Sequence, residues 1–314
     1  MELKPLKLGV IGLSEGNGHP YSWSAIVNGD FSMGHMKDCG FPVIPAYLDA
    51  NRETLGVDYA EVTHIWTQDR AVSEHVAAAA GIPTIVEKME DMIGSVDAVL
   101  LARDDPENHV AMAKPFVDAG VPIFIDKPLA FSRDDLEWFA TKIGEGKFIM
   151  SSSALRYSPG VQANRERIPE LGALQLAVAV GPKDLRKYAV HYLEGMLALL
   201  DDPVVAAVKH VSGASGKDVL HLEFDNGMLG VIGVFKNIAG GELNIYGAGG
   251  TLSVMHGGAY TSFRNHLVEA IHCFRTGKSR LPFEKTWNVI ATLCAARESL
   301  ENGGARIEVG SYSG

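Results

Sequence analysis

Residues 6–19 read LKLGVIGLSEGNGH and join a short apolar run to a glycine-rich turn. The apolar run at 6–12 is too short for a helix and predicts a buried strand. The turn after it stands where dinucleotide-binding proteins carry the G-x-G-x-x-G fingerprint, whose exposed backbone N–H groups face a pyrophosphate. The sequence therefore predicts a cofactor-binding loop here, with an ordinary glycine-rich turn as the alternative.

The spacing within this turn departs from the fingerprint. Ser14 stands at the place of its second glycine and Asn17 at the place of its third. Three positions still lack a side chain and leave the backbone open to a ligand, namely Gly12, Gly16 and Gly18. We take these five residues as candidate cofactor contacts.

Apolar runs alternate with helix-like stretches through the rest of the first half. The runs lie at residues 62–67, 84–86, 98–102, 122–126 and 148–152, and the helical stretches at 71–80, 106–119 and 133–143. Asp105 and Ser132 are the expected N-caps of the second and third helices. This alternation is typical of parallel strands joined by crossover helices. It predicts an α/β fold, with a Rossmann-type doubly wound parallel sheet in a dinucleotide-binding domain over residues 1–152.

Residues 17–61 are longer than the usual connection between the first two strands of such a domain. We interpret them as an insertion. Residues 41–53 do not suit the second strand, because Pro42 and Pro45 would each remove a hydrogen bond from the ladder. A surface excursion and a functional segment are both compatible with this stretch.

The second half predicts a sheet of another kind. Residues 220–224 alternate apolar and polar side chains, and the turn signal DNG at 225–227 precedes an apolar run at 229–235. Further strand-like runs lie at 174–180, 204–211, 242–246 and 251–255, and two amphipathic helices are expected at 263–276 and 287–300. We expect an α+β domain over residues 153–314 with an open, mainly antiparallel sheet.

The composition excludes several classes of protein. The 314 residues carry a formal net charge of -10, which opposes extended contact with nucleic acid or an anionic membrane. No segment approaches the roughly 20 apolar residues that span a bilayer, and the N-terminus lacks a signal-peptide pattern. The three cysteines show no disulfide or zinc spacing, and there is no H-E-x-x-H motif. We expect a cytoplasmic protein that binds no metal, no nucleic acid and no membrane.

The end of the second expected strand bears on the choice between NAD and NADP, because an acid there binds the ribose hydroxyls of NAD. Here Thr67 stands at the acid's place, Asp69 follows two residues later, and Arg70 could meet a 2′-phosphate. Both NAD and NADP therefore remain open as the cofactor. Arg103, just after the strand expected at 98–102, is a further candidate contact.

The segment FIDKPLA at residues 124–130 follows the fifth expected strand and resembles the glucose–fructose oxidoreductase / inositol dehydrogenase (Gfo/Idh/MocA-like) family. The family hallmark is E-K-P, and this chain carries Asp126, Lys127 and Pro128. Similar stretches lie on both sides of it: DAV at 97–99, DP at 105–106, AG at 119–120, NHLVEAIHCFRTGK at 265–278 and SLENGG at 299–304. The resemblance covers nearly the whole chain except roughly residues 17–61.

This resemblance implies hydride transfer to or from a sugar or cyclitol carbon. It also implies that residues 153–314 are a substrate-binding and oligomerisation domain, with homodimers or homotetramers formed through the C-terminal sheet. Lys127 would be the catalytic lysine, because a charged hydrogen bond can hold the reacting oxygen. Lys127 and Pro128 would also lie against the cofactor, joined by a bond that is often cis in the family. A surface lysine before a turn proline is the alternative.

The resemblance also implies an acid/base histidine, His191, in KYAVHYLEGM at 187–196. Histidine suits this role because it titrates near neutral pH. The family has an aspartate four residues before it, where this chain has Lys187. Glu194 shares a helix face with His191 and could orient it, while Tyr188 or Lys187 could replace the missing acid as a donor. An ordinary core or surface histidine is the alternative.

Substrate contacts are expected from five residues: His19, Arg156, Tyr157, Lys187 and Tyr188. An arginine suits the recognition of hydroxyl or carboxylate groups, although Arg156 could equally be structural. Together these residues predict an NAD(P)-dependent oxidoreductase that acts on a CH–OH group of a sugar, cyclitol or related polyol. A redox-assisted elimination or glycoside cleavage, in which the cofactor is retained, is a variant of this enzymatic function. A catalytically silent cofactor- or sugar-binding regulatory module of the same fold is the alternative.

Overall fold

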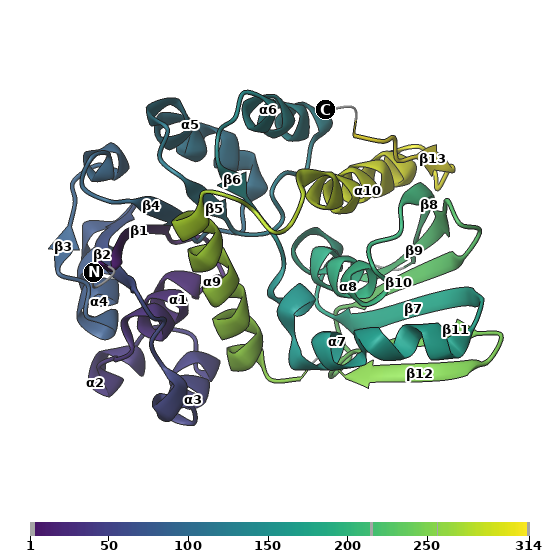
Figure 1. Cartoon of the computed structure of the whole chain (residues 1–314), viewed down its shortest axis with the longest axis horizontal. Helices are drawn as coiled ribbons and strands as arrows, with labels where there is room; N and C mark the ends of the chain where they lie inside the picture. The colour runs from purple at the N-terminus through teal and green to yellow at the C-terminus, as the bar shows by residue number, and fades with distance from the viewer. Residues whose placement is uncertain (1–3, 214–215, 256, 313–314) are drawn as a thin grey trace. The chain divides into compact units, whose positions relative to one another are not determined.

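The computed structural model describes residues 4–213, 216–255 and 257–312, and Figure 1 shows the path of the chain. The chain forms two compact units. Unit 1 comprises the described residues up to Leu129, together with Trp138–Ser151 and Phe263–Arg280. Unit 2 comprises Ala130–Glu137, Ser152–Ser262 and the described residues from Leu281 onward. Unit 1 thus takes in a segment from the C-terminal part of the sequence.

Unit 1 contains a six-stranded parallel sheet. Its strands are β1 (Leu6–Gly12), β2 (Ala60–Thr67), β3 (Thr84–Ile85), β4 (Ala98–Leu101), β5 (Ile123–Ile125) and β6 (Ile149–Met150). They lie in the order β3-β2-β1-β4-β5-β6. The strands β4 and β5 are buried throughout, as continuous apolar runs predict. The expected Rossmann-type sheet is confirmed, and its topological switch point lies between β1 and β4.

The main helices of unit 1 are α4 (Arg70–Ala80), α5 (His109–Ala119) and most of α9 (Ala259–Thr276), while α6 (Arg133–Gly144) has residues in both units. Asp69 caps α4, because its carboxylate accepts the N–H of Ala71 at 2.8 Å. Asp105 is the N-cap residue, as predicted, of a 3₁₀ turn, η3 (Pro106–Asn108), that precedes α5. Its side chain makes no capping hydrogen bond, because its carboxylate binds Arg103 and Asn108.

Helices fill the long connection between β1 and β2. They are α1 (His19–Asn28), α2 (Met33–Met36), α3 (Val43–Asp49) and the 3₁₀ turn η1 (Arg52–Thr54). Pro42 is the N-cap of α3 and Pro45 lies in its first turn, where backbone N–H groups have no partner within the helix. The prediction that residues 41–53 are not the second strand is confirmed, because β2 lies later in the chain.

Unit 2 contains a seven-stranded mixed sheet in the order β12-β11-β7-β10-β9-β8-β13. Its elements are η4 (Ala154–Tyr157), α7 (Pro159–Asn164), η5 (Arg165–Leu171), β7 (Leu174–Pro182), α8 (Leu185–Leu199), β8 (Val205–Ser212), β9 (Lys217–Phe224), β10 (Leu229–Phe235), β11 (Glu242–Gly247), β12 (Gly250–Met255), α10 (Phe283–Glu301) and β13 (Ile307–Glu308). The pair β7 and β10 is parallel and the other described pairs are antiparallel. The expected open, mainly antiparallel sheet is confirmed, including the β9–β10 hairpin with Gly227 at a φ of 83°.

The sheet of unit 2 carries apolar side chains that its helices do not bury. Leu176 on β7 lies opposite Leu229 on β10 and opposite Tyr246 on β11, so the three form a row across the sheet. Leu229 is 43% exposed and Tyr246 is 41% exposed, whereas Ala177, the next residue along β7, is buried. We call the side of the sheet that carries this row the outer face.

The three cysteines, Cys39, Cys273 and Cys294, are free and buried. Among the residues that the structure describes, no helix combines the length and the apolar character needed to cross a bilayer.

Candidate functional site

The glycine-rich loop joins β1 to α1 in unit 1. A side chain at Gly12 is excluded, because a Cβ there would lie 2.2 Å from Cγ of Pro20. Gly16 has a φ of +78°, and a Cβ on it would point into open space. Gly18 is the N-cap of α1 and is buried, and a Cβ there would lie 2.5 Å from Cδ1 of Ile44 and 2.7 Å from Cδ2 of Phe41. Among these three glycines, the loop therefore leaves its backbone uncovered at Gly16.

Two side chains bind the backbone of Leu13 in this loop. Gln68 follows β2 and Arg103 follows β4, the two strands on either side of β1. The N–H of Leu13 donates to Oε1 of Gln68 at 3.0 Å, and Nε2 of Gln68 donates back to the Leu13 carbonyl at 2.7 Å. Nη1 of Arg103 also donates to that carbonyl at 3.1 Å, while its Nε donates to Asp105 at 2.9 Å. Arg103 is buried, so a fixed cation lies behind the loop.

The two residues that replace fingerprint glycines anchor the loop to the sheet. Oγ of Ser14 donates to Oδ1 of Asp104, just after β4, at 2.7 Å. Nδ2 of Asn17 donates to Oδ2 of Asp126, just after β5, at 2.8 Å, and its Oδ1 accepts the N–H of His19 at 2.8 Å. Ser14 and Asn17, which replace two glycines of the fingerprint, thus form hydrogen bonds within the protein.

The loop still fits the pyrophosphate of a dinucleotide. Gly16 leaves its backbone uncovered, and the N-terminus of the ten-residue α1 carries a partial positive charge. Arg103 also lies at this edge of the sheet, where its guanidinium is paired with Asp105. Gly16 is the exposed glycine of the loop and its backbone would hold the pyrophosphate, whereas Gly12 and Gly18 are buried and Ser14 and Asn17 already have partners within the protein.

The residues expected to contact the ribose lie at the end of β2. Thr67 is buried, and its hydroxyl donates to the carbonyl of Asp69 at 2.6 Å. The carboxylate of Asp69 is occupied as the cap of α4. Arg70 lies 3.0 Å from Glu74 and 2.5 Å from Glu87, all three exposed. Two carboxylates therefore already offset the charge of Arg70.

Lys127 follows β5 and has only 5% of its side chain exposed. Its Nζ lies 3.7 Å from Oδ2 of Asp104, the same carboxylate that binds Ser14. A buried ammonium group is tolerated only beside such a partner. The bond from Lys127 to Pro128 is cis, in line with the resemblance. This lysine and the glycine loop thus share one carboxylate.

Asp126 is 1% exposed, and its carboxylate accepts three hydrogen-bond contacts. Oδ2 lies 2.6 Å from Nδ1 of His19 and 2.8 Å from Nδ2 of Asn17, and Oδ1 accepts the N–H of Lys127 at 2.8 Å. Burial alone would raise the pKa of Asp126, because it favours the neutral acid over the charged carboxylate. The charges of His19 and Lys127 and the hydrogen bonds outweigh burial, so the pKa of Asp126 lies well below its usual range.

His19, at the start of α1, has a firmly held ring. It stacks on Trp23 with centroids 4.6 Å apart and an interplanar angle of 13°. Phe263 of α9 meets the ring edge-on at 5.0 Å. The side chain of His19 is still 16% exposed, so the ring is fixed without being sealed from solvent.

His191 lies on α8 in unit 2 and has different neighbours. Its Nδ1 is 2.7 Å from Oγ of Ser153, and its ring centroid is 5.3 Å from that of Tyr188, one turn earlier. Lys187 lies one turn before His191 on α8, and its N–H donates to the capping Asp184 at 2.9 Å. His191 is half-buried, and its Nδ1 faces a hydroxyl group.

Glu194 does not bind the ring of His191, so the prediction of direct orientation is wrong. Its oxygens accept the N–H of Ser153 at 2.7 Å and Nε of Arg156 at 2.8 Å. Both Nη groups of Arg156 donate to Asp202, at 3.1 and 2.7 Å. Burial opposes the charge of Arg156, but the two carboxylates outweigh it and raise the pKa of Arg156 further. These ion pairs fasten η4 to α8.

The predicted residues thus gather in two groups, each within one unit. Unit 1 brings together the glycine loop, His19, Arg103, Lys127 and Pro128 at the carboxyl ends of β1, β4 and β5, with Thr67, Asp69 and Arg70 at the end of β2. Unit 2 brings together Arg156, Tyr157, Lys187, Tyr188 and His191 on η4 and α8. Sequence reasoning missed Gln68 and Asp104, and their only signal was a polar side chain directly after a strand.

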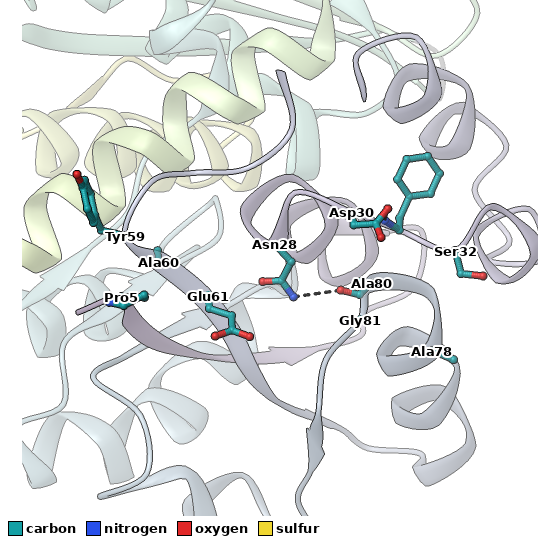
Figure 2. Close-up of a pocket in the computed structure, with 11 residues that line it drawn as sticks. Pro5, Asn28, Asp30, Ser32, Tyr59, Ala60, Glu61, Ala78, Ala80 and Gly81 are labelled. Carbon is teal, nitrogen blue, oxygen red and sulfur yellow. Dashed lines mark hydrogen bonds between the residues drawn. The ribbon is translucent and has the colours of Figure 1, made fainter. Parts of the chain in front are cut away.

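A cavity of about 620 Å³ lies elsewhere in unit 1 (Figure 2). Its lining includes Pro5 before β1, Ala60 and Glu61 at the start of β2, and Asn28 at the end of α1. The amide of Asn28 donates to the carbonyl of Ala80, as the dashed line in Figure 2 marks. The cavity is at the amino ends of the strands, and none of the predicted site residues lines it.

Comparison with known proteins supports the resemblance. A family model described as "Oxidoreductase family, NAD-binding Rossmann fold" (GFO_IDH_MocA) matches residues 37–147. An inositol 2-dehydrogenase from Saccharopolyspora erythraea is 29% identical over 143 residues, which span 44% of this chain and 42% of that protein. The alignment therefore covers less than half of the curated relative.

Solved structures extend the similarity in fold to nearly the whole chain. An apo scyllo-inositol dehydrogenase from Lactobacillus casei has a TM-score of 0.79 at 12% identity, covering 99% of this chain and 100% of that chain. A myo-inositol dehydrogenase from Lactobacillus casei, in complex with NAD(H) and myo-inositol, has a TM-score of 0.75 at 15% identity, covering 99% and 98%. The resemblance to the Gfo/Idh/MocA-like family is confirmed, and a nicotinamide dinucleotide agrees with the family's description as NAD-binding.

Proposed function

We propose, from its similarity to this NAD-binding oxidoreductase family, that the protein is an NAD-dependent dehydrogenase or reductase. Its substrate is a secondary alcohol, or the corresponding ketone, of a sugar, cyclitol or related polyol. The observation that carries the proposal is Lys127, a buried lysine at the carboxyl end of β5 that shares Asp104 with the glycine loop. A cation at this edge of the sheet is close to the place where the fold binds dinucleotides.

We propose NAD rather than NADP as the cofactor. Recognition of a 2′-phosphate would need a cation free to bind it. Arg70 is the cation expected there, and it is paired with both Glu74 and Glu87. A 2′-phosphate would have to compete with these carboxylates and would be repelled by them.

The residues have separate roles in this proposal. The bound dinucleotide supplies the hydride acceptor or donor. Lys127 donates a charged hydrogen bond to the reacting oxygen and stabilises the negative charge that develops on it. A histidine exchanges the hydroxyl proton, and His191 is the one that the resemblance implies. Tyr157, Lys187 and Tyr188 contact substrate hydroxyls, and Arg156 positions η4 through its ion pairs.

Replacement of Lys127 tests the proposal. A panel of sugars, cyclitols and sugar acids is first screened for change in NADH absorbance with the wild-type protein. Lys127→Ala is then expected to lower kcat by about 10³-fold, as loss of one preorganised donor does. Binding of NAD, followed by fluorescence, should persist. Lys114→Ala removes an exposed lysine paired with Asp118 and is the matched control.

Undiminished turnover by Lys127→Ala would refute the role of Lys127. Binding of NAD without turnover of any compound by the wild-type protein would favour the regulatory module instead.

We also propose that two copies associate through the outer face of the unit 2 sheet. The row of Leu176, Leu229 and Tyr246 is apolar and partly exposed, and such patches mark interaction sites. Leu229→Asp should shift the mass measured by light scattering to that of a single chain.

We also propose that the protein acts in the cytoplasm, where the three free cysteines would stay reduced.

A further inference from the structure

His19 and Asp126 form a hydrogen-bonded pair within unit 1 that the proposed function leaves unused. The contact joins Nδ1 of His19 to Oδ2 of Asp126 at 2.6 Å, across 107 positions of sequence. Asp126 is 1% exposed and His19 is 16% exposed. A buried carboxylate behind a partly exposed imidazole is the arrangement that orients a general base.

The carboxylate fixes which nitrogen of His19 carries hydrogen. Asp126 accepts hydrogen bonds from Nδ2 of Asn17 and from the N–H of Lys127, and although burial raises its pKa, these hydrogen bonds and the nearby charges lower it by more. The carboxylate is therefore ionised and only accepts hydrogen bonds. Nδ1 must therefore be the donor in this contact. In the neutral imidazole the other nitrogen, Nε2, then carries the lone pair that accepts a proton.

The neighbours of the ring suit repeated proton transfer. Trp23 stacks on its face and Phe263 closes its edge, and both are uncharged. Among the contacts of the described residues, the charged partner of His19 is Asp126. Lys127 is the next residue along the chain. His266 of α9 lies behind Trp23, with centroids 6.4 Å apart. The ring can therefore gain and lose a proton without losing its position.

His191 has a neutral partner at the same ring nitrogen. Its Nδ1 lies 2.7 Å from Oγ of Ser153, a hydroxyl that can donate or accept, so this contact leaves the position of the hydrogen open.

We propose that the proton of the reaction is exchanged by the His19–Asp126 pair, with His191 as a substrate-positioning residue. This inference rests on the proposed function. In the oxidative direction the carbinol O–H bond breaks, its proton passes to Nε2 of His19, and its electron pair forms the C=O bond. The hydride leaves the same carbon with two electrons for NAD⁺, so charge and atoms balance. Asp126 stabilises the imidazolium and keeps its own proton count unchanged.

Variants of three histidines test the inference. His19→Asn keeps an amide donor for Asp126 and removes the base, and His19→Gln removes the base with a longer amide. Both should lower kcat by about 10²- to 10⁴-fold while the Kd for NAD stays unchanged. His191→Gln should act mainly on KM, by about tenfold. His272→Gln, an exposed histidine of α9, is the matched control and should behave as wild type.

A second readout does not depend on turnover. The proton NMR spectrum of the wild-type protein should show a strongly downfield imidazole N–H resonance from the carboxylate-bound Nδ1. This resonance should disappear in His19→Gln and persist in His272→Gln and His191→Gln. In addition, His19→Ala should regain activity when imidazole is added, since a diffusing base can replace the lost ring.

The outcomes separate the two proposals. Wild-type turnover with NAD, together with kcat unchanged in His19→Asn, overturns the role of His19 and leaves the proposed function intact. Absence of the downfield resonance overturns the pair itself. Lack of turnover by the wild-type protein on every compound overturns the proposed function and the inference with it. If both His19 variants lose NAD binding, failure of imidazole to restore His19→Ala overturns the inference.

Discussion

His19 and His191 lie in different units and differ in what stands behind the ring. Behind His19 is the buried carboxylate of Asp126, held by Asn17 and by the N–H of Lys127. Behind His191 is the hydroxyl of Ser153, whose own N–H is held by Glu194. A carboxylate fixes both the tautomer and the favoured charge of a ring, whereas a hydroxyl fixes neither. Family resemblance can therefore locate a histidine without establishing its chemistry.

The largest expected effect comes from exchanging the group behind each ring. Asp126→Asn should lower kcat by about 10³-fold, because an amide can present a donor to Nδ1 and hold the wrong tautomer. Ser153→Ala should lower kcat by less than about tenfold, the loss of one neutral hydrogen bond. Steady-state kinetics of the two variants measure the contrast. Equal losses would mean that the two surroundings are equivalent in function.

A smaller effect is expected on stability in the surroundings of His191. Glu194→Ala leaves Arg156 with one carboxylate in a buried site, so the free energy of unfolding should fall by about 3 kcal/mol in urea titrations. Arg165→Ala, which removes an exposed ion pair with Asp201, should cost less than about 1 kcal/mol. The Kd for NAD should not change in either variant. A large fall in NAD affinity for Glu194→Ala would contradict the separation of roles.

The smallest expected effect is the contribution of Asp126 to the pH dependence of the free energy of unfolding. Its folded-state pKa is below the unfolded value, so the unfolded chain binds more protons in acid and stability is lost as pH falls. The loss should begin below about pH 5 in urea titrations of the wild-type protein. Asp126→Asn should show a shallower decline, and Asp58→Asn, an exposed control, should follow the wild type. Identical curves for wild type and Asp126→Asn would show that the carboxylate is not selectively stabilised.

Local patterns in the sequence were sufficient to predict both sheets except for the short strand β13 at the end of the second one. Continuous apolar runs mark the strands of unit 1, and the DNG turn marks the β9–β10 hairpin, because burial and turn geometry act on neighbouring residues. The helices between β1 and β2 were not predicted. Pro42 and Pro45 argue against a strand there, but at the start of a helix a proline costs no hydrogen bond.

The site was harder to predict than the fold. Lys127 could be proposed because D-K-P is a local motif, whereas the partners of His19 and Leu13 come from distant strand ends. Glu194 shows the reverse error. Its spacing suggested a contact with His191, and the structure gives its oxygens to Ser153 and Arg156. Helix periodicity specifies a face, and tertiary packing decides which partner on that face is bound.

The course of α9 has a consequence for synthesis on the ribosome. Phe263 closes the ring of His19, and Arg264 donates to the carbonyl of Thr54 at 2.6 Å, so unit 1 is completed by residues made late. Domains usually fold in order as the chain emerges. Here the nascent unit 1 must wait, with Phe124 of β5 and Trp23 of α1 lacking their contacts to α9, until most of unit 2 has been translated. A nascent chain arrested before residue 263 should therefore be more open to proteases around His19 than the finished protein.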